Sequence, residues 1–364
     1  MLPSAIAEAT AAFDRALRGD LGPTLALLDA LDASSDPVTV AWKQKLHAAA
    51  SLLAADEDPL FEAPRDTLAA GETLDGPGAL LCDEIQGLKA LRAFIAFRGL
   101  GNSDSAPRHG FGTASDAWHR LLRGEGPPEA VMDGLIAEAV RAKSSARLVE
   151  ATAVASLAAL SEGKLDRAVM LARRGSRMAR TEELCAHAYL ANLVLARARR
   201  ITGFPSQALR IAGALSAVVP SPWQHWVRWE QAMAGHLDGL GAEAEDPRAC
   251  VRDLLAAAKS GDRVRFEALG QSLVELAGDW VDAQRDAHAL LFSLDPARQS
   301  QDPTMGRALH APMAVHLRSF GASITSAEDG SAGVRVYAAP GQVTCRILES
   351  GVGFLPPGFE PVAL

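Results

Sequence analysis

Aromatic residues are scarce in this chain of 364 residues and make up only 5% of it. A β-sandwich or β-barrel usually fills its core with aromatic and β-branched side chains, so this composition argues against either fold. Hydrophobic residues still reach 48%, which leaves Ala, Leu and Val to fill the core. Because small side chains let helices approach closely and Ala has the highest helix propensity, we expect a mostly α-helical protein.

Cysteine is also rare, and its four positions are far apart and form no CxxC pair. This spacing gives no support for a zinc site, and so few cysteines in a long chain do not make a disulfide framework. We therefore expect reduced, buried thiols and no metal. The cysteines are Cys82, Cys185, Cys250 and Cys345.

Long apolar runs are missing, since no uncharged stretch approaches the ~20 residues that a membrane-spanning helix needs. The first residues have no basic segment, and Glu8 and Asp14 interrupt their apolar pattern, so they do not resemble a signal peptide. We expect a cytoplasmic protein without membrane contact. Acidic residues outnumber basic ones, 44 to 36, and the net charge of −8 argues against nucleic acid binding over the whole surface.

The sequence contains no familiar catalytic or metal-binding motif. HExxH, GxSxG and the Walker lysine loop are all missing. His310 and His316 are six positions apart, so they would not share one face of a helix as a metal-binding pair does. We therefore expect a protein that is not an enzyme and carries no cofactor.

Apolar residues recur with a helical period over most of the chain. We expect N-terminal helical hairpins over residues 1–98 and a longer array of paired helices over residues 114–294, separated by a loop. The last region, 304–364, is expected to hold one helix, a small three-stranded β-meander and an extended, proline-rich tail.

A short pattern begins at four glycines, each of which follows a helical stretch. A residue that is usually small comes five positions after each glycine, and an apolar residue comes three positions after that. Gly permits the left-handed turn that reverses the chain between two antiparallel helices, and the small residue lets the second helix lie close to the first. The pattern therefore predicts αα-hairpins at Gly19, Gly163, Gly203 and Gly261.

The hairpin over residues 189–220 resembles a tetratricopeptide repeat. The small, turn, small and terminal proline positions of that repeat are filled by Ala196, Gly203, Ala208 and Pro220. The chain departs from the family in two ways: Gly163 and Gly203 lie further apart than its ~34 residues, and Asn192 and Arg199 replace its aromatic residues. The resemblance implies a solenoid whose concave face binds a peptide, a protein or a small ligand.

Degenerate repeats of this kind are also similar to the helical sensor segments of MalT- and AfsR-type bacterial transcription regulators. In those proteins a winged helix usually lies elsewhere in the chain, and no convincing recognition helix is visible here. This resemblance implies a regulatory module that binds a small ligand or nucleic acid.

The middle of the chain is locally basic, although the chain as a whole is acidic. Basic residues far outnumber acidic ones between positions 164 and 210, and Arg173, Arg177 and Arg180 would share one helical face. They either bind an acidic peptide, a phosphate or nucleic acid, or they form ordinary solvated helix faces. The candidate partner-binding arginines are Arg173, Arg177, Arg180, Arg197, Arg199 and Arg200.

Trp223, Trp226 and Trp229 recur at a spacing of three and would lie on one side of a helix. They form either a core stripe, the interpretation that we favour, or an aromatic anchor for a partner. Taken with the repeats and the missing catalytic motifs, these features favour a helical scaffold or adaptor that binds a protein partner. The alternative is a sensor module of a bacterial transcription regulator that binds a small ligand or nucleic acid through the arginine-rich middle.

Overall fold

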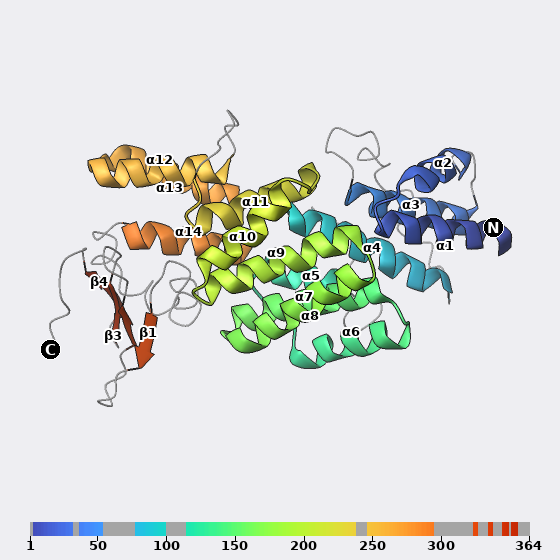
Figure 1. The fold of residues 1–364 in the computed structure, drawn as a ribbon, viewed down its shortest axis with the longest axis horizontal. Coiled ribbons are helices and arrows are strands. Elements are labelled where there is room, and N and C mark those ends of the chain that lie inside the picture. Colours follow the sequence, from blue (N-terminus) through green and yellow to red (C-terminus); the bar gives the residue numbers. More distant parts are fainter. Residues whose placement is uncertain are drawn as a thin grey trace.

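The computed structural model describes residues 3–31, 36–53, 77–99, 114–237 and 246–294, together with the backbone of short strands after residue 322. In these ranges the protein is mostly α-helical, and its 14 helices pack in sequential, adjacent pairs (Figure 1). This packing is consistent with a helical repeat and confirms the expected fold class at that level. No helix in these ranges is long and apolar enough to cross a membrane.

The helices follow one another with short connections in most of the described part. The first group comprises α1 (Pro3–Leu17), α2 (Gly22–Leu31), α3 (Pro37–Ser51), α4 (Pro77–Ile95), α5 (Ala114–Leu122) and α6 (Glu129–Arg141). The second group comprises α7 (Ser145–Ser161), α8 (Leu165–Thr181), α9 (Cys185–Ile201), α10 (Pro205–Ser216) and α11 (Ser221–Met233). The last group comprises α12 (Pro247–Ser260), α13 (Arg263–Leu276) and α14 (Val281–Leu294).

Near the C-terminal end the backbone runs through four short strands that pair antiparallel in sequence order. Because the residues around them lie outside the described ranges, the predicted C-terminal helix, β-meander and tail stay predictions. The strands are β1 (Ser323–Ser326), β2 (Val334–Tyr337), β3 (Thr344–Leu348) and β4 (Gly351–Leu355).

Aspartate and serine side chains fix the start of several helices. The Asp36 carboxylate accepts a hydrogen bond from the Thr39 amide at the start of α3, and Asp246 accepts one from the Arg248 amide at the start of α12. Ser144 and Asp262 do the same for α7 and α13. Each cap satisfies an amide that has no partner within the helix, so the sequence itself determines where these helices begin.

The glycines that the sequence pattern singles out reverse the chain as predicted. At the end of α7 the Gly163 amide donates to the Leu160 carbonyl, and the Lys164 amide donates to Ala159. These bonds close the helix while the chain turns back, and they require a left-handed residue. All four predicted glycines have this conformation: Gly19 (φ 92°), Gly163 (φ 75°), Gly203 (φ 86°) and Gly261 (φ 72°).

The small residues after these glycines bring the paired helices together. Ala168 of α8 and Ala208 of α10 are both fully buried, and the Ser156 hydroxyl of α7 donates to the Ala168 carbonyl at 2.8 Å. A Cβ atom at Gly175 would lie 2.8 Å from the Thr152 hydroxyl oxygen, so α7 and α8 nearly touch there. Close packing of these hairpins therefore depends on small side chains, as the sequence indicates.

The inner side of the array is occupied by other helices of the same chain. Helices α7 and α9 pack against each other and each forms a hairpin with the helix that follows it, α8 or α10. Helix α5 also packs on α7, while α11 and α1 pack on α9, so neither α7 nor α9 has an exposed residue. The concave face that the resemblance implies is therefore not open along these two helices.

Several of the few aromatic residues gather where α4, α5, α11 and α14 meet. Phe94 lies 4.8 Å from both Trp118 and Trp280 and 5.6 Å from Trp226, measured between ring centroids. Phe97 adds edge-on contacts to Trp226, Trp229 and Trp280. This cluster joins the N-terminal helices to the C-terminal ones and fills the centre of the molecule.

Candidate functional site

The predicted arginines separate into buried and exposed sets. Arg197 and Arg200 of α9 are only 1% and 0% exposed, whereas Arg173, Arg177 and Arg180 of α8 all face solvent. One prediction therefore covered two different environments, a buried one on α9 and an exposed one on α8.

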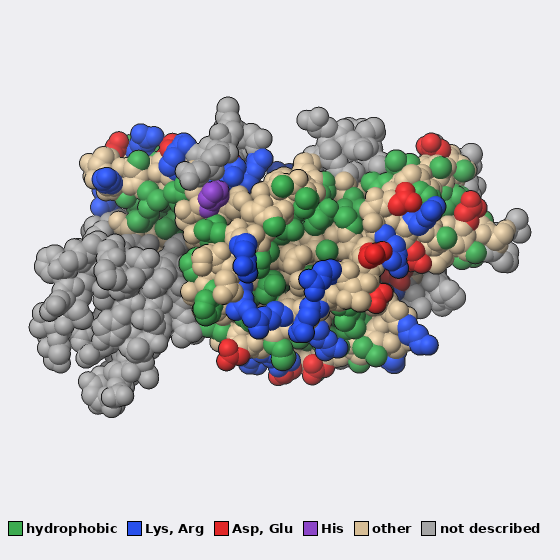
Figure 2. Space-filling model, in the orientation of Figure 1, with side chains coloured by type: hydrophobic (Ala, Val, Ile, Leu, Met, Phe, Trp, Pro, Cys, Tyr) green, Lys and Arg blue, Asp and Glu red, His purple; other side chains and the backbone are tan. Residues whose placement is uncertain are grey.

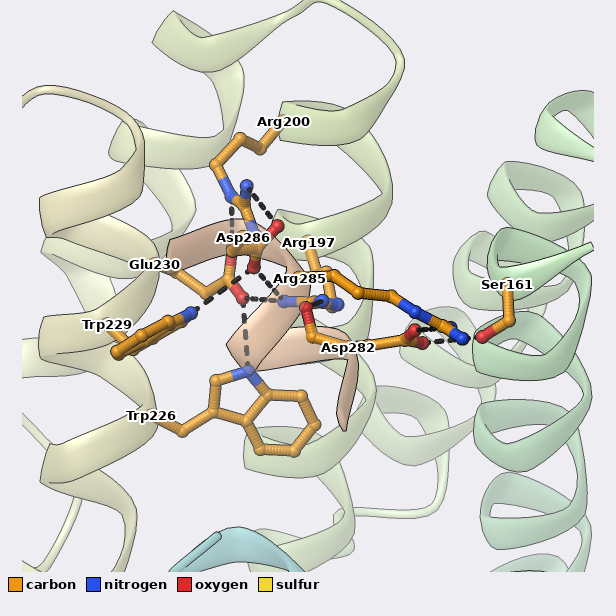
Figure 3. Close-up of polar contacts among 9 residues, drawn as sticks. All are labelled: Ser161, Arg197, Arg200, Trp226, Trp229, Glu230, Asp282, Arg285 and Asp286. Carbon is orange, nitrogen blue, oxygen red and sulfur yellow. Dashed lines mark hydrogen bonds and ion pairs between the residues drawn. The ribbon is translucent and has the colours of Figure 1, made fainter. Parts of the chain in front are cut away.

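Two carboxylates neutralise the buried arginines, and these four side chains form the buried ion-pair cluster (Figure 3). Glu230 of α11 accepts from Arg197 Nη1 at 3.0 Å and from Arg200 Nε at 2.7 Å. Asp286 of α14 accepts from Arg197 Nη1 at 2.8 Å and from Arg200 Nη2 at 2.7 Å. The cluster thus balances two positive and two negative charges across three helices.

Indole groups complete the surroundings of the carboxylates. Trp226 Nε1 lies 3.3 Å from Glu230 Oε1, and Trp229 Nε1 lies 3.3 Å from Asp286 Oδ2. The guanidinium carbon of Arg197 lies 4.3 Å from the ring centroid of Trp280, a cation–π contact. Every charged group in the buried ion-pair cluster therefore has several partners, which is the condition for burying an ion pair without a large penalty.

The buried ion-pair cluster has the properties of a structural joint. Burial alone would lower the pKa of Arg200, but the charges of Asp286 and Glu230 and their hydrogen bonds outweigh it and raise the pKa above its ordinary value. The guanidinium consequently stays charged at every physiological pH and cannot exchange a proton with a substrate. What it can do is fix α9, α11 and α14 relative to one another.

A second polar contact extends this joint to α7. The Ser161 hydroxyl lies 2.5 Å from Asp282 Oδ2, and Arg285 Nη1 donates to Asp282 Oδ1 at 2.6 Å. Arg197 Nη2 also donates to the Asp282 carbonyl at 3.1 Å. Helix α14 is therefore tied to α7 and α9 by its Asp282 and Asp286 side chains, one helical turn apart.

The three tryptophans of α11 occupy the core, as the favoured interpretation predicts. Trp223, Trp226 and Trp229 are each 0% exposed, and Trp223 Nε1 donates to the Leu52 carbonyl at 2.6 Å. None of them can contact a partner unless the helices separate. These tryptophans, like Arg197 and Arg200, are therefore not part of any partner-binding surface of the folded protein.

The outer arginine face, as we call it, consists of exposed arginines on α8 and α10. None of them has an ion pair with any residue in the described ranges. Nearby basic side chains differ: Glu129 binds Arg167 and has a lowered pKa because of that hydrogen bond, and Glu162 binds Lys164. The members are Arg173, Arg174, Arg177 and Arg180 of α8 and Arg210 of α10.

Arg199 lies at the border of the outer arginine face. It is half-buried, and its guanidinium carbon lies 5.7 Å from the ring centroid of Phe204, in the turn before α10. Since α8 and α10 both run antiparallel to α9, Phe204 lies at the end of the face where α8 begins. The turn therefore supplies a half-exposed aromatic ring next to the arginines.

Acidic groups are few on this part of the surface, although Asp166 in the first turn of α8 is exposed. Between Glu183 and Glu230 the sequence has no Asp or Glu, and Glu183 itself lies 3.9 Å from Arg18 of α1. Figure 2 shows Lys and Arg side chains over the region where Figure 1 places α8 and α9, with Asp and Glu along its lower margin and on the side toward α1. The outer arginine face is thus a local basic surface on an acidic protein.

The predicted binding residues did not include Arg174 and Arg210, although both belong to the locally basic middle of the sequence, and the acidic half of the buried ion-pair cluster was not connected to the arginines. A signal for Glu230 exists, since it is the first acid after a long acid-free stretch and follows the tryptophan stripe. Asp282 and Asp286 share a helical face, which also marks them. No such signal connects these residues to Arg197, because the contact depends on tertiary structure.

The described ranges contain no group of three or more His, Cys, Asp or Glu side chains that could hold a metal ion. Cys250 is buried, and burial raises the pKa of its thiol to about 11, so it is a poor nucleophile or ligand. The chain matches no family model, and no curated protein or solved structure is significantly similar to it.

Proposed function

We propose that this protein is a helical scaffold that binds a protein partner with an acidic surface through the outer arginine face. The observation that carries the proposal is the set of exposed arginines on α8 and α10 without ion pairs in the described ranges. Like charges one turn apart destabilise a helix by about 0.2–0.5 kcal/mol per pair. An acidic partner would convert this repulsion into attraction.

The arrangement of the helices supports a scaffold whose binding surface is on the outside. The inner side of α7 and α9 is filled by α5, α11 and other helices of the chain, so a ligand has no access there. The outer helices α8 and α10 each pack on α9 through one side and leave the other to solvent. In this proposal α7–α10 are degenerate tetratricopeptide-like repeats that present their second helices to the partner.

A protein partner fits the surface better than single-stranded nucleic acid does. Single strands are bound by stacking successive bases on several exposed aromatic rings, whereas the tryptophans of α11 are fully buried and Phe204 offers one half-exposed ring at one end of the face. The formal net charge of −8 also repels a long polyanion, while a short acidic segment meets only the local basic surface. The proposed partner is therefore a protein with a compact cluster of carboxylates.

Site-specific photo-crosslinking tests this proposal. Met170 lies on α8 beside the arginines and is 60% exposed, and Val264 on α13 is 83% exposed, so each can be replaced by a photoreactive residue. We expect Met170, but not Val264, to capture a partner protein from a lysate of the native organism. The triple variant Arg173→Glu, Arg177→Glu, Arg180→Glu should abolish the capture.

A matched triple reversal provides the control. Lys259, Arg263 and Arg265 are exposed around the turn between α12 and α13, and reversing them changes the net charge by the same amount. Capture at Met170 should survive this control. Equal loss in both triple variants, or capture of nucleic acid in place of protein, would contradict the proposal.

A further inference from the structure

We infer that the partner segment is an acidic α-helix that lies along α8, with an apolar residue at the end where α8 begins. This inference rests on the proposed function and gives the partner a shape and a direction. It comes from the register of the exposed residues on α8 and from what borders them at each end.

Four of the exposed residues of α8 form a line along one face of the helix. Met170, Arg173, Arg177 and Arg180 are spaced by three or four positions and therefore lie on the same face. With a rise of about 1.5 Å per residue, the line is roughly 15 Å long and repeats about once per helical turn. Arg174 lies next to this line, and Arg210 is on α10, the other outer helix that packs on α9.

A helix matches this repeat better than an extended strand does. Carboxylates at every turn of a partner helix recur about every 5.4 Å, the same interval as the arginines. On one face of a strand they recur about every 6.6 Å, so a strand loses register over three successive pairs. Helix α8 also has no free strand edge on which an extended peptide could add main-chain hydrogen bonds.

The two ends of the line differ, and this sets the direction. At the Met170 end the exposed apolar side chains are Met170 (60%) and, in the turn before α10, Phe204 (48%), which favour an apolar residue of the partner. The exposed Asp166 lies one turn beyond Met170, so the acidic stretch of the partner should not extend past it. At the other end Glu183 pairs with Arg18, and the Arg18 guanidinium also donates to the Glu182 carbonyl at 3.1 Å. Glu182 and Glu183 carry two carboxylates here against the one guanidinium of Arg18, so this end repels further carboxylates and the acidic stretch of the partner should stop near Arg180.

Two synthetic peptides of identical composition test the inference. The aligned peptide carries Glu at three successive helical turns and Leu one turn beyond, and the scrambled peptide distributes the same residues around the helix at equal helicity. Binding of each fluorescein-labelled peptide to the full chain is followed by fluorescence anisotropy in low and moderate salt. We expect the aligned peptide to bind about tenfold more tightly, the sum of several weak exposed ion pairs.

The variants separate charge from shape. Arg177→Glu should lower the affinity for the aligned peptide by about tenfold. Met170→Ala should lower this affinity by a few-fold, and only when the peptide contains Leu. The triple control on the α12–α13 turn should leave both affinities unchanged. These results together would support a helix with the stated direction.

The contrary outcomes distinguish this inference from the proposed function. If both peptides bind with equal affinity and the triple variant of α8 binds neither, the inferred helix is overturned. The proposal of an acidic protein partner is then still supported. No binding of either peptide also overturns the inference. Tighter binding of duplex DNA or of anionic vesicles than of either peptide, with the same dependence on the α8 arginines, overturns both.

Discussion

The backbone amide of Asp279 donates a hydrogen bond to the carbonyl of Phe97 at 2.7 Å, although the two residues lie far apart in the sequence. The contact joins the end of α4 to the turn between α13 and α14. The Asp279 carboxylate returns to accept from the Gly99 amide at 2.6 Å. The segment after α4 and the turn between α13 and α14 are thus joined by two hydrogen bonds. These bonds hold α4 next to the C-terminal helices.

Gly278→Ala should strongly destabilise the protein. Gly278 has φ 56°, and a Cβ atom there would lie 2.2 Å from the Phe97 carbonyl oxygen. Left-handed strain and the clash together should lower the free energy of unfolding by about 2–4 kcal/mol. Gly235→Ala is the control, because Gly235 has φ 88° but open space around it, and should cost only about 1 kcal/mol. Urea unfolding measures both, and equal effects would disprove the contact.

The buried ion-pair cluster should show strong coupling between Arg200 and Asp286. Asp286→Asn leaves a buried guanidinium partly uncompensated and should cost about 3–5 kcal/mol of unfolding free energy. The double variant Arg200→Met, Asp286→Leu should recover most of this loss, because Arg197 and Glu230 still balance each other. The exposed pair Arg263–Glu267 is a matched control and should couple by less than about 0.5 kcal/mol. Additive effects in the cluster would contradict this account.

The helical hairpins could be predicted because their signals are local. A glycine such as Gly163 and a small residue such as Ala168 are only five positions apart, so the sequence shows both parts of the reversal. Phe97, Lys143 and Glu183 make left-handed turns without glycine, with φ of 58°, 49° and 55°. The glycine pattern could not find those turns, because the hydrogen bonds of the helix ends, rather than the residue type, hold them.

The sequence could not predict which arginines are buried and which are exposed, because their burial depends on helices that are distant in the sequence. Arg197 and Arg200 share one face of α9 and Arg199 lies on another, which the helical period does show. Which face is inside depends on Glu230 and Asp286 from α11 and α14, far along the chain. A sequence pattern can therefore separate the two faces but cannot assign either of them to the core.

Asp246 should make the protein sensitive to acid. Burial alone would raise the pKa of its carboxyl, but hydrogen bonds from the side chain and backbone of Arg248, with the charges of Arg248 and Arg228, lower it. The folded state then binds fewer protons than the unfolded state, so this stabilisation is complete above about pH 5 and is lost as pH falls through the lowered value. Asp246→Asn should cost about 1 kcal/mol at pH 7, and little at pH 2.

Urea unfolding at a series of pH values measures the effect of Asp246→Asn. Asp29→Asn on the exposed side of α2 removes the same charge and serves as the control. The difference between wild type and Asp246→Asn should shrink toward low pH. A difference that stays constant from pH 7 to pH 2 would show that Asp246 acts only as a neutral hydrogen-bond acceptor.

Arg177→Glu should separate stability from binding. Arg177 lies one turn from both Arg173 and Arg180, so the change replaces two repulsive pairs with attractive ones and should raise the unfolding free energy by about 1 kcal/mol. The same change should reduce the crosslinking of a partner at Met170, because it reverses the charge at the centre of the outer arginine face. Arg177→Gln should shift both quantities in the same directions by roughly half as much. If Arg177→Glu instead lowered the unfolding free energy, Arg177 would be holding the fold, and a lost partner could no longer be assigned to the surface.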